Sequence, residues 1–323
     1  MAHNIAPLPN GTQVDEYIID SVLGGGGFSI VYNAHLVSDN DQTVIIKEFM
    51  PKKLAVRINT TEVTSLDPSA PESYNKGRKL FFQEASTLAT LKHPNIVDVT
   101  NFFQTNGTAY MVMKDEKGVN LQEYIRKYKG KLSEKLLRKV FPQLLSGVKL
   151  LHDKDLLHLD IKPSNIHLRQ GGRPLLLDFG AVREKMKTRL YDARIVATAG
   201  FAPIEQVTER GYMGPWTDIY AIGATMRSCI EGTPPPPANK RKDNDPMKPA
   251  VIAFKKKYSK VILEAIDWAM EPDPRLRPQT CDELLEMLEQ MPEEDESKTL
   301  LEKLSFENIS NVLPWKKSNK DEI

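Results

Sequence analysis

Cysteine is scarce in this chain, which has only Cys229 and Cys281 among its 323 residues. Domains stapled by disulfides are rich in cysteine, and a zinc site needs cysteine or histidine ligands at short spacings. The two cysteines lie far apart, and no histidine ligand pattern accompanies them. We therefore expect two buried, reduced thiols and no zinc.

Long apolar runs and an excess of either charge are also missing. No stretch approaches the roughly 18 consecutive apolar residues of a membrane-spanning helix, and the N-terminus lacks the basic and apolar regions of a secretory signal. The 44 basic and 43 acidic residues give a formal net charge of +1, so the chain as a whole is not attracted to nucleic acid or anionic membranes. We expect a cytoplasmic protein with no membrane insertion and no nucleic-acid partner.

Polar residues gather in one stretch of the chain, between Leu156 and Gly180. Asp160, Lys162 and Asn165 lie close together there, and a later apolar run ends in Asp178. The two short apolar runs around a glycine turn predict a hairpin, which would bring Asp160 and Asn165 near Asp178. Two carboxylates, an amide and an ammonium group suit a divalent cation and phosphate oxygens, because hard cations prefer oxygen ligands.

A glycine run separates two strand-like segments near the N-terminus. It consists of Gly24, Gly25, Gly26 and Gly27. Without Cβ atoms, such a hairpin lets a ligand approach the backbone closely, although a glycine run alone is weak evidence and is more often a plain flexible turn. A dinucleotide-binding loop would need a helix directly after the glycines, and the strand-like FSIVY that follows argues against one.

Two further charged residues lie in apolar surroundings. Lys47 interrupts the strand-like TVIIKEF, where a lysine either reaches solvent at a strand end or meets an anion; the upstream glycines favour the anion. Glu84 lies in a helical pattern over 73–91, and the apolar face of this helix should turn it inward. That face is predicted to hold Leu80, Thr87, Leu88 and Leu91.

These stretches together resemble the eukaryotic-like protein kinases. The family pattern H-R-D-x-K-x-x-N followed by D-F-G is matched over 158–180, with Leu159 in place of the arginine. The pattern G-x-G-x-x-G-x-V is matched over 24–31, with Ser29 in place of the third glycine.

Three features in the second half of the chain extend the resemblance. The stretch 200–205 is similar to the family's A-P-E motif, Asp218 to its buried anchoring aspartate, and Arg277 to the arginine that pairs with the motif's glutamate, here Glu205. Lys162 and Thr198 match the residues typical of serine/threonine kinases, in which the threonine contacts the catalytic aspartate.

The resemblance implies a role for each site residue. Asp160 would accept the substrate proton, Lys162 would neutralise the transferred phosphoryl group, and Lys47, fixed by Glu84, would hold the α- and β-phosphates. Asn165 and Asp178 would bind Mg²⁺, with Mn²⁺ as an alternative. The remaining residues expected to bind ATP are Gly24, Gly25, Gly26, Gly27, Phe28, Ser29 and Val31 over the phosphates and Met113, Lys114 and Glu116 near the adenine. An ordinary core position for Met113 is equally compatible with the sequence.

The implied fold is α+β and bilobal, with a β-rich N-lobe over 14–114 and a helical C-lobe over 115–291. A flexible arm over 1–13 and a tail over 292–323 would flank it, and the stretch 51–72, with a predicted hairpin, would elaborate the N-lobe. The stretch GFAPIEQ and the elaboration of the N-lobe suggest a bacterial enzyme, and we expect its substrate to be a protein. The sequence specifies neither the identity of that substrate nor an oligomeric state.

Leucine at position 159 cannot bind a phosphate, whereas the family's arginine there often binds one on the activation segment. We therefore hypothesise that activity does not depend on phosphorylation of that segment. Two alternatives stay open: a pseudokinase that binds nucleotide without transfer, supported by Leu159 and Ser29, and a kinase of small-molecule hydroxyls, which would usually lack the A-P-E motif and the Asp218 and Arg277 pair.

Overall fold

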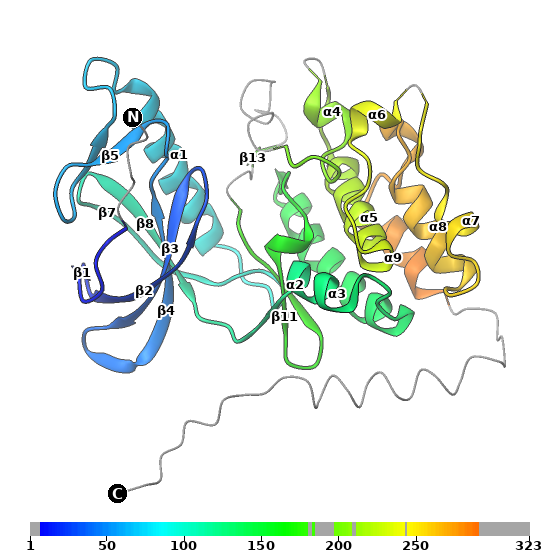
Figure 1. Ribbon diagram of the computed structural model, residues 1–323, viewed down its shortest axis with the longest axis horizontal. Coiled ribbons are helices and arrows are strands. Elements are labelled where there is room, and N and C mark those ends of the chain that lie inside the picture. The colour runs from blue at the N-terminus through cyan, green and yellow to red at the C-terminus, as the bar shows by residue number, and fades with distance from the viewer. Residues whose placement is uncertain (1–6, 180–182, 185–196, 209–210, 243, 291–323) are drawn as a thin grey trace, which may run out of the picture. The chain divides into compact units, whose positions relative to one another are not determined.

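The computed structural model describes residues 7–179, 183–184, 197–208, 211–242 and 244–290. The chain divides into two compact units, Met1–Lys117 and Gly118–Ile323. Strands dominate the first unit and helices the second (Figure 1).

The first unit is built on a six-stranded antiparallel sheet. Its strands, in sheet order, are β1 (Gln13–Val14), β2 (Tyr17–Gly25), β3 (Ser29–Leu36), β4 (Asp39–Phe49), β8 (Thr108–Lys114) and β7 (Val99–Thr105). Every second side chain of β3 is buried, namely Ile30, Tyr32 and Ala34. This period of two places one face of the strand in the core.

Helix α1 (Glu72–Ala89) packs against β7 and β8 through Phe81, Ala85 and Leu88, which are buried. The ring of Phe49 lies 5.6 Å from that of Phe81. The predicted inner face was wrong at Leu80, which is 36% exposed, because the aromatic residue one position later occupies the inner position. Glu84 is half-buried at the flank of the buried face.

The stretch 51–72 forms the predicted hairpin. Strand β5 (Ala55–Arg57) pairs with β6 (Val63–Ser65), and Asn59 closes the turn by accepting hydrogen bonds from two backbone amides. Arg57 ties the hairpin to the sheet, since its Nη2 donates to Glu48 Oε2 at 2.7 Å. The expected flexible arm differs from the structure in residues 7–13, where Leu8 is 1% exposed and its amide donates to the Tyr32 hydroxyl.

The second unit surrounds the long helix α5 (Pro215–Glu231), most of whose residues are buried. The other helices are α2 (Leu121–Tyr128), α3 (Glu134–Asp153), α4 (Ile204–Val207), α6 (Ala238–Arg241), α7 (Ala250–Ala253), α8 (Lys260–Ala269) and α9 (Cys281–Glu289), with the short 3₁₀ turns η1 (Pro163–Asn165) and η3 (Pro274–Leu276). The strands among its described residues form two small sheets, β12 (Arg173–Leu176), β11 (Ile166–Arg169) and β9 (Gly118–Asn120) in one, β10 (Leu156–Leu157) and β13 (Arg183–Glu184) in the other.

Local signals in the sequence explain several features of this unit. Ser133 caps the N-terminus of α3, since its side chain accepts from the Leu136 amide, as serine commonly does at this position. The predicted hairpin β11–β12 turns through Gly171 and Gly172, both with positive φ. Both cysteines are free and buried, as expected.

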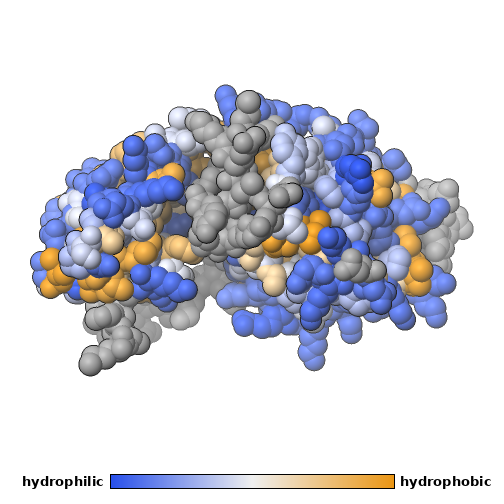
Figure 2. Space-filling view, turned by 90° about the horizontal axis from the view of Figure 1, so that it is seen from above, coloured by the Kyte–Doolittle hydropathy of each residue, from blue (hydrophilic) through white to orange (hydrophobic). Residues whose placement is uncertain are grey.

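The face drawn in Figure 2 is mostly hydrophilic, with apolar patches among the polar atoms. Among the helices of the described residues, none combines the length and apolar character needed to cross a membrane.

Candidate functional site

The candidate site in the second unit is centred on Asp160, which lies in the loop between β10 and η1. The Asp218 carboxylate in the first turn of α5 fixes this loop by accepting the amides of His158 at 2.9 Å and Leu159 at 2.8 Å. Asp218 is completely buried. Burial alone would raise its pKa, but the hydrogen bond with His152 and the nearby histidines hold this pKa below its usual value. Asp218 therefore has the buried anchoring position that the resemblance implies.

The Asp160 carboxylate is surrounded by hydrogen-bond donors. Lys162 Nζ donates to both of its oxygens, at 2.9 and 2.8 Å, and Asn165 Nδ2 donates to Oδ2 at 3.0 Å. Thr198 Oγ1 donates to Oδ1 at 2.8 Å, which confirms the predicted contact of this threonine with the aspartate. These four bonds hold the carboxylate in one orientation.

Strand β11 begins directly after Asn165 and pairs with β12, and Asp178 lies two residues beyond the end of β12. The amide of Leu177 donates to the Asn165 carbonyl at 2.8 Å, so the chain runs from this bond directly into Asp178. His158 lies beside Phe179, with ring centroids 4.8 Å apart. Burial lowers the pKa of His158, although Asp218, Asp160 and Asp178 all lie close enough to favour its protonated form. The predicted approach of Asp178 to Asp160 and Asn165 thus fits these contacts.

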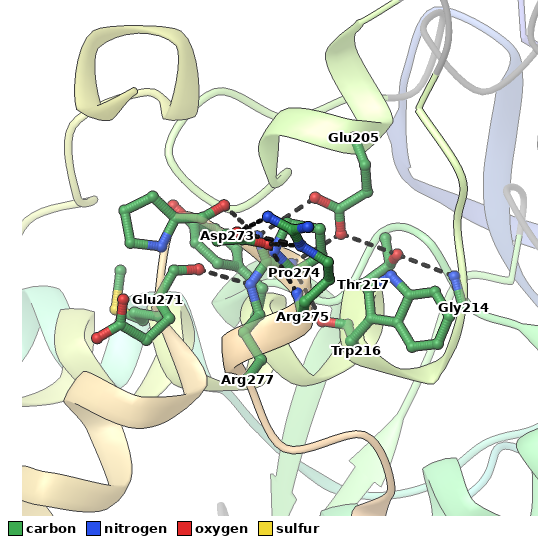
Figure 3. Close-up of polar contacts among 12 residues, drawn as sticks. Glu205, Gly214, Trp216, Thr217, Glu271, Asp273, Pro274, Arg275 and Arg277 are labelled. Carbon is green, nitrogen blue, oxygen red and sulfur yellow. Dashed lines mark hydrogen bonds and ion pairs between the residues drawn. The ribbon is translucent and has the colours of Figure 1, made fainter. Parts of the chain in front are cut away.

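A buried ion pair anchors helix α4, which contains Glu205 (Figure 3). Arg277 Nη1 lies 2.7 Å from Glu205 Oε1, and both side chains are buried. Thr217 Oγ1 donates to the same carboxylate oxygen at 3.0 Å, and the guanidinium lies over the ring of Tyr220 at 4.7 Å. The predicted pairing of Glu205 with Arg277 is confirmed.

Two residues that the sequence analysis did not single out contact Leu159. Gln206 Nε2 donates to the Leu159 carbonyl at 2.6 Å, and the Leu159 side chain clusters with Leu157 and Met213. Leu159 has a φ of 63°, a left-handed conformation that costs an L-residue roughly 1–2 kcal/mol. Gln206 could have been noticed in the sequence because it directly follows the A-P-E-like motif. No local sequence signal identifies Met213.

The glycine hairpin belongs to the first unit. Gly24 and Gly25 of β2 lie opposite Val31 and Ile30 of β3, and the amide of Gly26 donates to the Ser29 carbonyl at 2.9 Å. A Cβ added to Gly24, Gly26 or Gly27 would meet nothing within 4 Å, and none of the three has a positive φ. Neither packing nor backbone conformation therefore requires glycine there, which leaves flexibility or close approach of a ligand as the reason.

The other predicted ATP-binding residues of this unit lie on β4, α1 and the end of β8. Lys47 is 8% exposed and pairs in register with Val31 on one side and Met111 on the other. Of the predicted adenine-binding residues, Met113 is half-buried, and Lys114 Nζ lies 3.6 Å from Glu116 Oε1. Ser29 begins β3, and Phe28, directly before this strand, is 52% exposed. The pairing of Lys47 with Glu84 and the adenine contacts stay predictions.

A divalent cation would find few protein ligands here. Among the described residues, no group of three or more His, Cys, Asp or Glu side chains is placed to hold a metal ion. Asn165 and Asp178 offer one amide and one carboxylate, which suits Mg²⁺ because this ion usually keeps waters and shares substrate phosphates rather than entering an all-protein cage.

Comparison with known proteins agrees with these features. A family model described as "Protein kinase domain" matches residues 17–298. The chain is 29% identical over 286 residues to serine/threonine-protein kinase PknA of Nostoc sp. (strain PCC 7120), covering 85% of this chain and 47% of the relative. It is 29% identical over 226 residues to serine/threonine-protein kinase B of Synechocystis sp. (strain PCC 6803), covering 66% and 36%.

The chain spans less than half the length of these two curated relatives. Among solved structures, "PpkA-294 apo form" is 37% identical and superposes with a TM-score of 0.78, covering 88% of this chain and 99% of that one. The α+β fold of a helical unit and a β-rich unit is thus the protein-kinase fold, and the chain belongs to the eukaryotic-like bacterial serine/threonine protein kinase family.

Proposed function

We propose that this chain transfers the γ-phosphoryl group of Mg-ATP to serine or threonine hydroxyls of proteins, its own included. The arrangement around Asp160 carries this proposal, because Lys162, Asn165 and Thr198 together fix its carboxylate. Phosphoryl transfer needs little covalent chemistry from the protein, so positioning and charge neutralisation account for most of the catalysis.

Asp160 accepts the proton of the attacking hydroxyl. A carboxylate offers about four lone-pair sites, and all four are used by the bonds from Lys162, Asn165 and Thr198. A substrate hydroxyl must therefore displace one donor. Lys162 makes two of the four bonds and can give up one of them while its ammonium group turns to the negative phosphoryl oxygens. The Thr198 bond keeps the carboxylate oriented meanwhile.

Asn165 and Asp178 are the residues that would hold the divalent cation, Mg²⁺ or Mn²⁺. When bound, the cation neutralises negative charge on the phosphates. Asn165 also donates to the Asp160 carbonyl at 2.9 Å, so one side chain links the proposed metal ligand to the proposed base.

In the first unit, the glycine hairpin (24–31) and Lys47 would bind the phosphates, and Glu84 would orient Lys47. The open space around the glycine Cβ positions supports this role. Met113, Lys114 and Glu116 would lie near the adenine.

Transfer from labelled ATP in the presence of Mg²⁺ tests the proposal. Wild type should label serine or threonine, and Asp160→Asn and Lys47→Ala should each lose at least about 100-fold in rate, because the first removes the base and the second the phosphate contact. Asp153→Asn and Lys53→Ala change the same residue types at exposed positions and should keep the wild-type rate.

Three outcomes would contradict the proposal. ATP binding without any transfer would indicate a pseudokinase. Transfer to an aminoglycoside or choline but to no protein would indicate a small-molecule kinase. Equal rates for Asp160→Asn and wild type would show that the site lies elsewhere.

A further inference from the structure

The second unit carries a cavity that the proposed phosphoryl transfer does not use. It has a volume of about 330 Å³ and lies between α2 and the hairpin β11–β12. Its apolar lining comes from Val119, Leu136 and Leu168 and from the rings of Tyr124 and Tyr128, whose centroids lie 4.6 Å apart. Tyr128 is 36% exposed, so the cavity opens as a groove to the surface.

The rim of this groove is basic. Arg126, Lys127 and Arg169 line it, and Glu123 is its one acidic lining residue. Arg126 and Lys127 are exposed on α2. An apolar floor with a cationic rim fits a segment that carries leucines next to acidic residues, because each part then meets its complement.

The chain itself passes close to this groove. Arg138 Nη1, on α3, donates to the carbonyls of Leu288 at 2.7 Å and Gln290 at 2.9 Å. Leu136, two residues before Arg138 on the same helix, lines the cavity. Ten extended residues span up to about 33 Å, so the residues that follow Gln290 can reach the groove without strain.

The sequence after Gln290 has the required chemistry. Four consecutive acidic residues occupy 293–296, and apolar residues follow at Leu300, Leu301, Leu304 and Phe306. We propose that the segment 293–306 binds the groove of its own chain, with the acidic residues at the basic rim and the leucines on the apolar floor. Tethering raises the effective concentration of such a segment to the millimolar range, so a weak contact suffices to keep it bound.

Hydrogen exchange of the full chain without nucleotide tests this proposal independently of phosphoryl transfer. In a variant with Leu300, Leu301 and Leu304 changed to serine, the amides of α2 and β11 should exchange at least about tenfold faster than in wild type. The matched variant Val312→Ser with Leu313→Ser should exchange like wild type. Unchanged exchange in the first variant, or equal changes in both, would overturn the proposal.

Charge reversal provides a second test. Arg126→Glu with Lys127→Glu should also accelerate exchange of β11 and should weaken binding of a synthetic 291–307 peptide, added in trans to the leucine variant, by about tenfold. Lys255→Glu with Lys256→Glu makes the same change in net charge at exposed positions away from the groove and should do neither. Retained peptide binding by the first double variant would overturn the proposal.

The own-chain arrangement predicts that protection of α2 is independent of protein concentration. If protection disappears on tenfold dilution, a second copy supplies the segment and the proposal is wrong. If only an added acidic peptide protects α2, while the leucine substitutions change nothing, the groove serves another protein and the proposal is equally wrong.

Discussion

Replacing Arg57 by methionine should destabilise the first unit by about 3–5 kcal/mol. The Glu48 carboxylate is completely buried and accepts hydrogen bonds from Tyr32 at 2.7 Å, Tyr110 at 3.0 Å and Arg57 at 2.7 Å. Arg57 is its one ion-pair partner among the described residues, and its own side chain is 3% exposed. Removing one member of a buried pair leaves the other charge buried and uncompensated, which is the origin of this cost.

The assay must report on the first unit alone. All three tryptophans of the chain follow Gly118, so tryptophan fluorescence would follow the other unit. Hydrogen exchange of the slowest amides in β2, β3 and β4 is the suitable measurement. A loss of about 3–5 kcal/mol accelerates their exchange between about 100-fold and several thousand-fold, at 1.4 kcal/mol per factor of ten.

The double variant Glu48→Gln with Arg57→Met is the control, because it removes both charges while the two tyrosine hydroxyls keep an amide partner. It should recover most of the lost protection, since uncharged replacements of a buried pair are often close to neutral. If Arg57→Met exchanges like wild type, or if the double variant is as unstable as the single one, the buried ion pair is not what ties the hairpin β5–β6 to the sheet.

Three further predictions concern the second unit. Gln206→Leu should lower kcat about tenfold or more with the KM for ATP nearly unchanged, because the buried Leu159 carbonyl loses its donor, at a cost of about 1–3 kcal/mol; an unchanged kcat in steady-state kinetics would contradict this. Thr188→Val with Tyr191→Phe, at positions outside the described residues, should leave the rate nearly unchanged, and a loss of about 100-fold, or about 2.7 kcal/mol, would refute independence from phosphorylation. Because burial lowers the pKa of His158, the unfolded state takes up a proton at mildly acidic pH that the folded state does not, so the free energy of unfolding should fall as the pH drops below about 6.5, the ordinary pKa of histidine; His158→Phe should reduce this fall in urea denaturation, and an unchanged fall would count against the assignment.

Features that local sequence specifies were predictable. Ser133 starts α3 because its side chain caps the helix, and the glycines of the β11–β12 turn adopt the positive φ that other residues avoid. The pairing of Glu205 with Arg277, 72 residues apart, was predictable only through family resemblance. No local pattern relates two such distant positions.

Features that depend on competition between neighbours were not predictable. Both Leu80 and Phe81 suit an inner position of α1, and the packing of Phe81 on Phe49 decides between them. Leu8 is buried, and its amide donates to the hydroxyl of Tyr32, 24 residues later. A proline-containing N-terminal stretch gives no sign of such a partner.

Leu159, which replaces the family's arginine, is held by contacts of a different kind from those that an arginine would make. An arginine at this position would reach a phosphate, so its order would depend on phosphorylation. The leucine is 3% exposed and packs with Met213, while Gln206 holds its carbonyl and Asp218 its amide. None of these contacts requires a phosphate. Gln206 and Met213 both follow residue 197 in the chain, so the loop that holds Asp160 is joined to this later part of the chain by packing and a neutral hydrogen bond, and these contacts are present in the unmodified chain.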